Sequence, residues 1–334
     1  MASGVKASVV LITYNHERFI AEALESVLSQ RTGFPFEIIV SEDCSTDRTA
    51  EIAEGFRAQH PDRFRLIRSS PNVGDNTVVS RGILAAQGEY IALLDGDDYW
   101  SSPDKLQKQV NFLDERPDCS ICFHNVRVLY EGREQAEHPF HLSSPKPRLS
   151  SPVPKATSQL VDLVTGNFIQ TCSVMLRAGV LQGIPDWYAG LPLGDWPLYV
   201  LYAEHGDIGY LDEVLSTYRI HQGGWWSEGF SRFRDYAEVR EMLRTYDVLD
   251  AHLGGRYHDR IRRAAGYLHR RAVLALLAER RFGRAFRHWR MYAASNGIRK
   301  ALCDKPMARA AARGLRPARS DTRPSPSRTT AGNP

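Results

Sequence analysis

Three carboxylates crowd into four consecutive residues, Asp95-Gly96-Asp97-Asp98, which directly follow the apolar run from Tyr90 to Leu94. Carboxylates this close together repel one another unless a cation or positive groups compensate them. Oxygen-only ligands favour a hard cation such as Mg²⁺ or Mn²⁺, and such a cation often shares its shell with phosphate oxygens. Gly96 allows a sharp turn and the close approach of a diphosphate. The loop therefore predicts a cation and diphosphate site; the alternative is a solvated turn whose aspartates cap the next helix.

The second half of the chain contains two more segments whose side chains can do chemistry. In Leu193-Gly194-Asp195-Trp196-Pro197, an aspartate stands at a turn that opens a helix, where it could take up a proton or cap the helix. In Tyr218–Trp226, the cationic Arg219 and the metal-capable His221 precede a flexible diglycine, and an ordinary polar loop is the alternative. Aromatic rings that could stack on the apolar face of a sugar, or else pack in the core, are those of Trp196, Trp225 and Trp226.

The first half of the chain alternates between strand and helix patterns. Short β-branched runs predict strands at residues 8–13, 36–40, 64–67 and 90–94. Asn15, and then Ser45 or Thr46, are expected to cap the helices between them. Repeated units of this length predict a mostly parallel sheet with helices on both faces. Because ligands of such sheets bind beyond the carboxyl ends of the strands, one edge is expected to gather residues 13–15, 42–43 and 95–98.

Beyond residue 130 the pattern is less regular. A Pro/Ser/His-rich loop is expected at 132–158, further strands at 171–176 and 208–218, and a helix at 196–204. The last two apolar stripes, at 261–276 and 282–293, predict a helical hairpin. We therefore expect one α/β domain over residues 1–229, a helical C-terminal region over 230–313 and a disordered tail over 314–334.

Several segments, taken in order, resemble the family 2 inverting glycosyltransferases, which have the Rossmann-like GT-A fold. They are Val9–Asn15, Glu37–Asp47, Asn72–Gly74, Arg81–Gly82, Gly88–Ile91 and Leu94–Asp98. Each motif is weak alone, but their order makes a chance likeness improbable, and the resemblance extends from residue 5 to about residue 226. This chain has Thr13 where many members have proline. It also has Ser41-Glu42-Asp43 where many have paired aspartates, so Glu42 is open between a structural and a functional carboxylate.

The resemblance implies a set of residues that bind the sugar donor. Thr13 and Tyr14 would line the base pocket, and Asp43 would accept a hydrogen bond from the nucleobase. Arg81 corresponds to a residue that contacts the base or the diphosphate, and Arg219 to one that approaches the diphosphate. The whole donor-binding set is Thr13, Tyr14, Asn15, Asp43, Arg81, Asp95, Gly96 and Arg219.

The resemblance also implies a metal site and a general base. Asp97 would bind Mn²⁺ or Mg²⁺ directly, Asp95 would lie near the metal or the ribose, and His221 could complete the metal shell. Asp98 would act through water, by capping, or as a contact to sugar or acceptor. Asp195 corresponds to the aspartate that takes the proton of the acceptor hydroxyl in this family.

The implied reaction moves a sugar from a UDP-, dTDP- or GDP-sugar to a hydroxyl of a glycan, lipid-linked or small-molecule acceptor, as in polysaccharide or glycan biosynthesis. Inversion needs a carboxylate that deprotonates the acceptor opposite the leaving nucleotide, through an oxocarbenium-like transition state. A non-catalytic nucleotide-sugar-binding protein is the alternative. A sugar-1-phosphate nucleotidyltransferase is disfavoured because residues 13–17 contain no glycine, and a hydride-transfer enzyme because no G-x-G-x-x-G follows the first strand.

The net charge of +4 hides an uneven distribution. From Arg256 to Arg328 there are 20 Lys and Arg against 4 Asp and Glu, a balance of +16 that leaves about −12 for the rest. The acidic remainder argues against a nucleic-acid partner, whereas the basic end suggests peripheral contact with anionic membrane lipids. No apolar run is long enough to span a membrane. With five cysteines, an odd number, and no leader pattern, a cytoplasmic location is expected, with contact to the inner face of the membrane.

Overall fold

The computed structural model describes residues 4–131, 138–139, 156–222, 224 and 235–314, so the expected tail and most of the 132–158 loop lie outside the described residues. The strands are β1 (Ala7–Thr13), β2 (Phe36–Glu42), β3 (Phe64–Arg68), β4 (Tyr90–Asp95), β5 (Tyr99–Trp100), β6 (Cys119–Tyr130), β7 (His138–Pro139), β8 (Thr157–Ser158), β9 (Met175–Arg177) and β10 (Asp207–Ile220). The helices of the sheet domain are α1 (Ile20–Leu28), α2 (Thr49–Gln59), α3 (Thr77–Ala85), α4 (Lys105–Glu115), α5 (Leu160–Leu163) and α6 (Asp195–Ala203).

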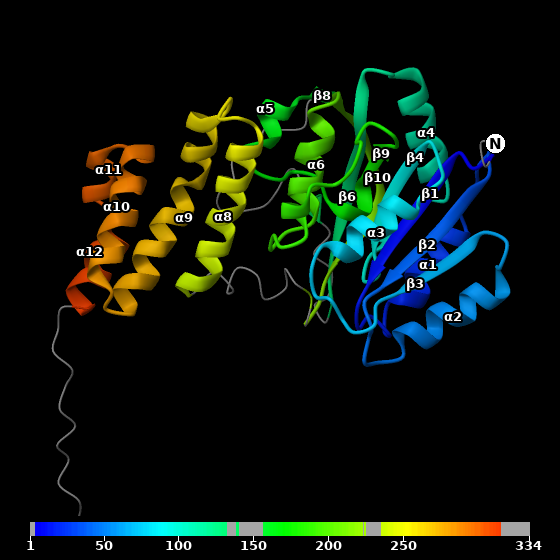
Figure 1. Ribbon diagram of the computed structural model, residues 1–334, viewed down its shortest axis with the longest axis horizontal. Coiled ribbons are helices and arrows are strands. Elements are labelled where there is room, and N and C mark those ends of the chain that lie inside the picture. Colours follow the sequence, from blue (N-terminus) through cyan, green and yellow to red (C-terminus); the bar gives the residue numbers. More distant parts are fainter. Residues whose placement is uncertain (1–3, 132–137, 140–155, 223, 225–234, 315–334) are drawn as a thin grey trace, which may run out of the picture.

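The central sheet has the strand order β3-β2-β1-β4-β9-β6-β10-β5, and β7 pairs with β6 and β8 with β10. Figure 1 shows the sheet with α2 and α3 beside it. Strands β3, β2, β1 and β4 are parallel, and so are β6 and β10. Strand β9 is antiparallel to both β4 and β6 and joins the two parallel groups. The predicted mostly parallel sheet is confirmed. The strand expected at 171–176 is instead a 3₁₀ turn, Thr171–Ser173, followed by the short β9.

Both faces of the sheet are covered by helices, as a run of buried β-branched residues requires. Along β1, Val9 and Leu11 belong to one apolar cluster and Val10 to another. The first cluster contains residues of α1, α2 and α4, and the second contains residues of α3 and α6. This doubly covered sheet fixes the carboxyl ends of β1, β2 and β4 at one edge.

Two expected helix caps are wrong. Helix α1 begins only at Ile20, and Asn15 instead has a left-handed backbone with φ of 55°. Its side-chain oxygen accepts a hydrogen bond from the Thr46 backbone at 2.8 Å. Neither Ser45 nor Thr46 caps α2, because the Thr49 backbone N–H donates to Asp47 Oδ1 at 2.9 Å. Polar residues at this edge hold loops to each other rather than beginning helices.

The C-terminal region is helical, with α8 (Tyr236–His252), α9 (His258–Ala278), α10 (Phe282–Asn296), α11 (Ile298–Leu302) and α12 (Lys305–Gly314). Buried residues of α8 join the apolar cluster of the sheet domain, and α9 and α10 pack together as the predicted hairpin. Figure 1 shows α10, α11 and α12 at the end of the molecule away from the sheet. Within the described ranges, no helix is long and apolar enough to cross a membrane.

Candidate active site

The acidic loop lies at the end of β4 and is tied to the end of β1. The Gly96 N–H donates to the Ile12 carbonyl at 2.8 Å, and the Asp98 N–H donates to the Asp95 carbonyl at 3.0 Å. A Cβ atom on Gly96 would stand 2.6 Å from Thr13 Oγ1 and 2.9 Å from His16 Nδ1. Glycine is therefore required here by the close approach of the β1 loop, a reason that the sequence pattern did not show.

The three carboxylates of the loop have different surroundings. Asp95 and Asp97 are partly exposed, whereas Asp98 is 1% exposed, and its Oδ1 accepts the backbone N–H of Arg219 at 2.8 Å. Asp98 Oδ2 has no hydrogen-bond partner within the described part of the chain. Burial and the charge of Asp97 raise the pKa of Asp98 well above its usual value. Because Asp98 is buried, its expected contact with sugar or acceptor does not fit this arrangement.

Two histidines flank Asp97. Its Oδ2 lies 3.1 Å from His221 Nε2 and 3.8 Å from His16 Nε2. Burial opposes ionisation of Asp97, but the contact with His221 and the charges of both histidines lower its pKa. The bond to Asp97 raises the pKa of His221, while burial lowers that of His16. His221 was expected at this site, whereas His16 was not, because no sequence motif distinguishes it.

Among the described residues, no group of three or more His, Cys, Asp or Glu side chains is arranged so that it could hold a metal ion. The donor set nevertheless fits a hard divalent cation. Burial and the charges of Asp97 and Asp195 raise the pKa of Asp95 to about 8, and Asp98 Oδ2 is buried without a partner. The negative charge of the loop is thus not fully neutralised by the surrounding residues, and a bound cation would compensate it.

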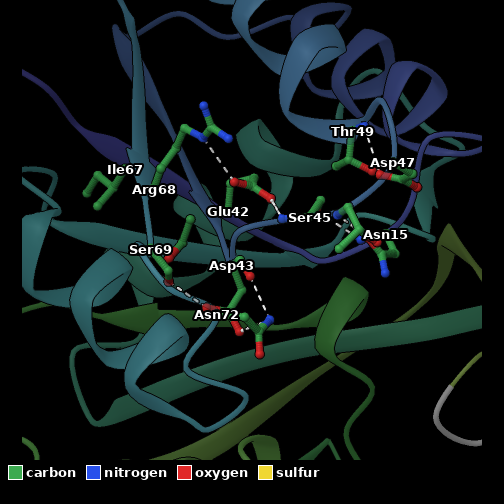
Figure 2. Close-up of polar contacts among 12 residues, drawn as sticks. Asn15, Glu42, Asp43, Ser45, Asp47, Thr49, Ile67, Arg68, Ser69 and Asn72 are labelled. Atoms are coloured by element: carbon green, nitrogen blue, oxygen red, sulfur yellow. Dashed lines mark hydrogen bonds and ion pairs between the residues drawn. The ribbon is translucent and has the colours of Figure 1, made fainter.

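The carboxylate of Asp43, which follows β2, accepts hydrogen bonds from residues 69–74 of the loop after β3 (Figure 2). Its Oδ1 accepts bonds from the Ser69 hydroxyl and from the Val73 N–H at 3.0 Å. Its Oδ2 accepts bonds from Asn72 Nδ2 and the Gly74 N–H, both at 2.9 Å. Four donors fill the lone-pair directions of a carboxylate. In this conformation Asp43 shapes the 69–74 loop, so a nucleobase would have to displace one of these donors.

Arg81 is engaged in the same network. Its Nε donates to Ser41 Oγ at 2.7 Å, and its Nη2 donates to the Glu42 carbonyl at 2.7 Å. Its Nη1 donates to Ser69 Oγ, which in turn donates to Asp43. The structure therefore does not support a direct contact of Arg81 with the base or diphosphate; its guanidinium holds Ser69 and Asp43 in place.

Beside this network, Glu42 and Asn15 form hydrogen bonds that hold residues 45–46 of the loop after β2 (Figure 2). Glu42 is fully buried, accepts the Ser45 N–H at 2.5 Å and lies 3.1 Å from Arg68 Nε. Asn15 accepts from Thr46 and its own N–H donates to Ser45 Oγ at 2.9 Å. Glu42 is thus the structural carboxylate of the two alternatives. Both side chains fix the shape of the edge where a donor would bind.

The remaining donor-binding candidates differ in how accessible they are. Tyr14 is 43% exposed at the end of β1, so its ring is available to a ligand, whereas Thr13 is 1% exposed and contacts His16. The Arg219 guanidinium lies over the rings of Phe19 and Tyr99 and donates to Glu22 Oε2 at 2.6 Å. Arg219 would have to leave Glu22 to reach a diphosphate.

Asp195 begins α6 with its carboxylate held in a defined orientation. Asn167 Nδ2 donates to Asp195 Oδ2 at 2.6 Å, and the Trp196 N–H contacts Oδ1 at 2.7 Å. Burial raises the pKa of Asp195, although these hydrogen bonds oppose that rise. The negative charge of Asp195 contributes to the raised pKa of Asp95. This electrostatic interaction links two carboxylates that are a hundred residues apart in sequence.

The segment before Asp195 is held by Asn76, which precedes α3. Asn76 Nδ2 donates to the carbonyls of Tyr188, Leu191 and Leu193 at 3.1, 2.9 and 3.2 Å. A Cβ on Gly194 would lie 2.7 Å from Asn76 Oδ1, so a glycine is needed there. Asn76 and Asn167 position this segment and the Asp195 carboxylate, and neither could be predicted from sequence because a lone asparagine in a loop carries no motif.

The expected sugar contact of Trp196 is wrong. This side chain is 2% exposed, its Nε1 donates to the Leu163 carbonyl at 2.8 Å, and its ring packs 4.7 Å from that of Tyr246. Trp196 therefore anchors α6 in the core, the alternative that the sequence left open. Trp225 and Trp226, the other two candidates, lie outside the described residues.

The sequence pattern of glycosyl transferase family 2 matches residues 8–182, which include β1 to β4 and the acidic loop. The chain belongs to this family. The putative glycosyltransferase EpsE of Bacillus subtilis is 43% identical over 236 residues, 70% of this chain and 77% of EpsE. An uncharacterized protein of Mycobacterium tuberculosis is 40% identical over 235 residues, 70% of this chain, and this match spans 64% of the mycobacterial protein.

Solved structures show the same fold for this family 2 member. TarS of S. aureus, residues 1–349 in complex with UDP-GlcNAc, has a TM-score of 0.54 at 18% identity, over 89% of this chain and 92% of the other. The mannosyltransferase PcManGT from Pyrobaculum calidifontis, in complex with GDP-Man and Mn²⁺, has a TM-score of 0.55 at 17% identity, over 92% and 84%. The expected GT-A fold is thereby confirmed.

Proposed function

We propose that the chain transfers a sugar from a nucleoside-diphosphate sugar to an acceptor hydroxyl, with inversion, assisted by a divalent cation. The observation that carries the proposal is the acidic loop at the end of β4 together with Asp195 at the start of α6, which follows a segment held by Asn76 at the start of α3. Asp195 and the loop are close enough for the Asp195 charge to raise the pKa of Asp95. An inverting transfer needs a sugar-donor site and a proton acceptor within the same active site.

Asp97, Asp95 and His221 would hold the cation. When bound, a divalent cation supplies positive charge that stabilises the diphosphate leaving group. UDP-GlcNAc in TarS and GDP-Man with Mn²⁺ in PcManGT support a nucleotide-sugar donor and a divalent metal on this fold. At this edge of the sheet, the exposed ring of Tyr14 can contact the nucleobase. Asp43, whose carboxylate binds the 69–74 loop, follows the neighbouring strand β2.

Asp195 is the proton acceptor in the proposed reaction. The acceptor oxygen forms a bond to the anomeric carbon, the bond from that carbon to the diphosphate breaks, and the hydroxyl proton moves to the Asp195 carboxylate. Asn167 and the Trp196 N–H hold this carboxylate so that it need not reorient during the reaction. Burial raises its pKa toward the range in which a carboxylate is an efficient base.

The pH dependence of turnover should respond to Asn167. A general base works when deprotonated, so turnover should rise with pH through the raised pKa of Asp195. Asn167→Ala removes a hydrogen bond that stabilises the charged carboxylate, so the rising limb should move to higher pH. The measurement is kcat against pH, with Asn111→Ala, on the exposed face of α4, as the control. A limb that stays in place or moves to lower pH would contradict the role of Asn167.

A thermal-shift screen tests the donor class. UDP-, dTDP- and GDP-sugars, and a nucleoside triphosphate with a sugar 1-phosphate, are each added with Mn²⁺ or with EDTA, and the unfolding temperature is recorded. Ligand at a hundredfold excess over Kd stabilises by about 2.7 kcal/mol, which raises Tm by several degrees. We expect one base class to stabilise the protein, and to do so more strongly with Mn²⁺. Stabilisation only by a nucleoside triphosphate with a sugar 1-phosphate would favour the nucleotidyltransferase alternative and sink the transferase proposal.

A further inference from the structure

Helices α10 and α11 expose large apolar side chains. Phe286, Ile298 and Leu302 are 60%, 61% and 65% exposed, and Phe282 and Met291 are each 38% exposed. These five residues are half of the ten exposed large apolar side chains in the described part of the chain, and they fall within residues 282–302. Single exposed apolar residues are normal, but a concentration of them indicates an interaction surface.

The same segment is strongly basic. Residues 280–303 contain seven Lys and Arg and no Asp or Glu. The exposed guanidinium groups of Arg284, Arg287, Arg290 and Arg299 make no ion pair with any residue that the structure describes. These charges are therefore available to an anionic partner.

The buried side of α10 and α11 is formed by other residues. The inner side of the pair is already buried, because Ala285, Tyr292 and Ala301 join residues of α9 in their own apolar cluster. Trp289 Nε1 donates to the Ala301 carbonyl at 3.5 Å, which links α10 to α11. The spacing of four residues between Phe282 and Phe286, and between Ile298 and Leu302, puts each pair on one face of its helix.

We propose that α10 and α11 bind the surface of an anionic lipid bilayer. The exposed phenylalanine, isoleucine and leucine side chains would enter the interface, and the arginines would contact lipid phosphates. An amphipathic basic helix with aromatic residues on its apolar side is typical of proteins that lie on a membrane. This inference does not depend on the proposed transfer reaction or on the identity of the donor.

Two other occupants fit the surface less well. A second copy of the chain packed about a two-fold axis would set this basic segment against itself, since such an interface joins the same patch of both copies. A nucleic acid would use the arginines but would leave Phe286, Ile298 and Leu302 in water. The bilayer surface is the partner that accounts for both the charge and the apolar side chains.

Vesicle co-sedimentation of the full chain tests this proposal. We expect binding to phosphatidylcholine vesicles with about 30% phosphatidylglycerol, and little binding to pure phosphatidylcholine, because the arginines need anionic headgroups. High salt should weaken the binding without removing it. Absence of binding to the anionic vesicles at low salt would overturn the proposal. Retention on heparin without vesicle binding would do the same and would assign the surface to a soluble polyanion.

Paired variants separate the two contributions. Phe286→Ser combined with Leu302→Ser should weaken vesicle binding by about tenfold or more, because insertion depends on buried apolar area. Arg287→Glu combined with Arg290→Glu should remove the preference for anionic lipid. The matched controls are Leu84→Ser on α3, where Leu84 is 69% exposed, and Arg31→Glu on the sheet domain; both should bind like the wild type. Circular dichroism checks folding, and patch variants that bind like their controls would overturn the proposal.

Discussion

Asp97→Ala is expected to abolish the metal-dependent part of donor binding. Asp97 is the partly exposed carboxylate of the acidic loop whose pKa is lowered, so it remains charged and able to bind a cation. Loss of groups that merely orient metal ligands costs about tenfold to a hundredfold in affinity, so loss of a ligand should cost at least about a hundredfold. The measurement is calorimetric titration of the nucleotide sugar found in the screen, with Mn²⁺ and with EDTA.

The control for this experiment is Asp62→Ala, which removes an exposed carboxylate that has no hydrogen bond or ion pair in the described structure. Because Asp97 also contacts His221, thermal unfolding of the variant without ligand should be compared with the wild type. Asp97→Asn keeps the size of the side chain and should show the same loss. Donor binding that responds to Mn²⁺ in Asp97→Ala as it does in the wild type would remove Asp97 from the metal site.

Asp195→Asn is expected to spare donor binding and to stop transfer. The amide keeps the shape of the side chain and its place at the start of α6, but it cannot take a proton from the acceptor. General bases contribute about 10²–10⁴ to the rate, so turnover should fall by that factor while the donor Kd stays within about twofold. Asp186→Asn, at an exposed position in the segment before Asp195, is the matched control and should retain turnover. A variant at Asp195 that loses donor binding as well would point to a structural role.

The edge of the site could be predicted from sequence because parallel β-α units obey simple rules. Strand patterns that end at Thr13, Val40 and Leu94 place the loops that follow them together once the strands are parallel and adjacent. The role of Asp195 was inferred from family resemblance, and its charge contributes to the raised pKa of Asp95 in the acidic loop. No periodic pattern in the sequence predicts this interaction. It depends on the three-dimensional arrangement of later segments, including the insertion of β9 between β4 and β6.

Individual side-chain roles were less predictable, since they depend on which partner is nearest in space. Arg81 and Asp43 look like ligand-binding residues in sequence, yet in the structure they contact each other through Ser69. Trp196 has the type of a sugar-stacking residue but is buried against α8. Conversely, Asn167 holds the carboxylate of Asp195 although its neighbours in sequence show no motif.

Release of nucleoside diphosphate tests the central claim most directly. The wild type, Asp97→Ala and Asp195→Asn are compared with the screened donor at one saturating concentration, with Mn²⁺ and the glycan acceptor that supports the fastest release in a panel. We predict metal-dependent release by the wild type and a loss of about a hundredfold or more in each variant. Full turnover by both variants would contradict the account of this site.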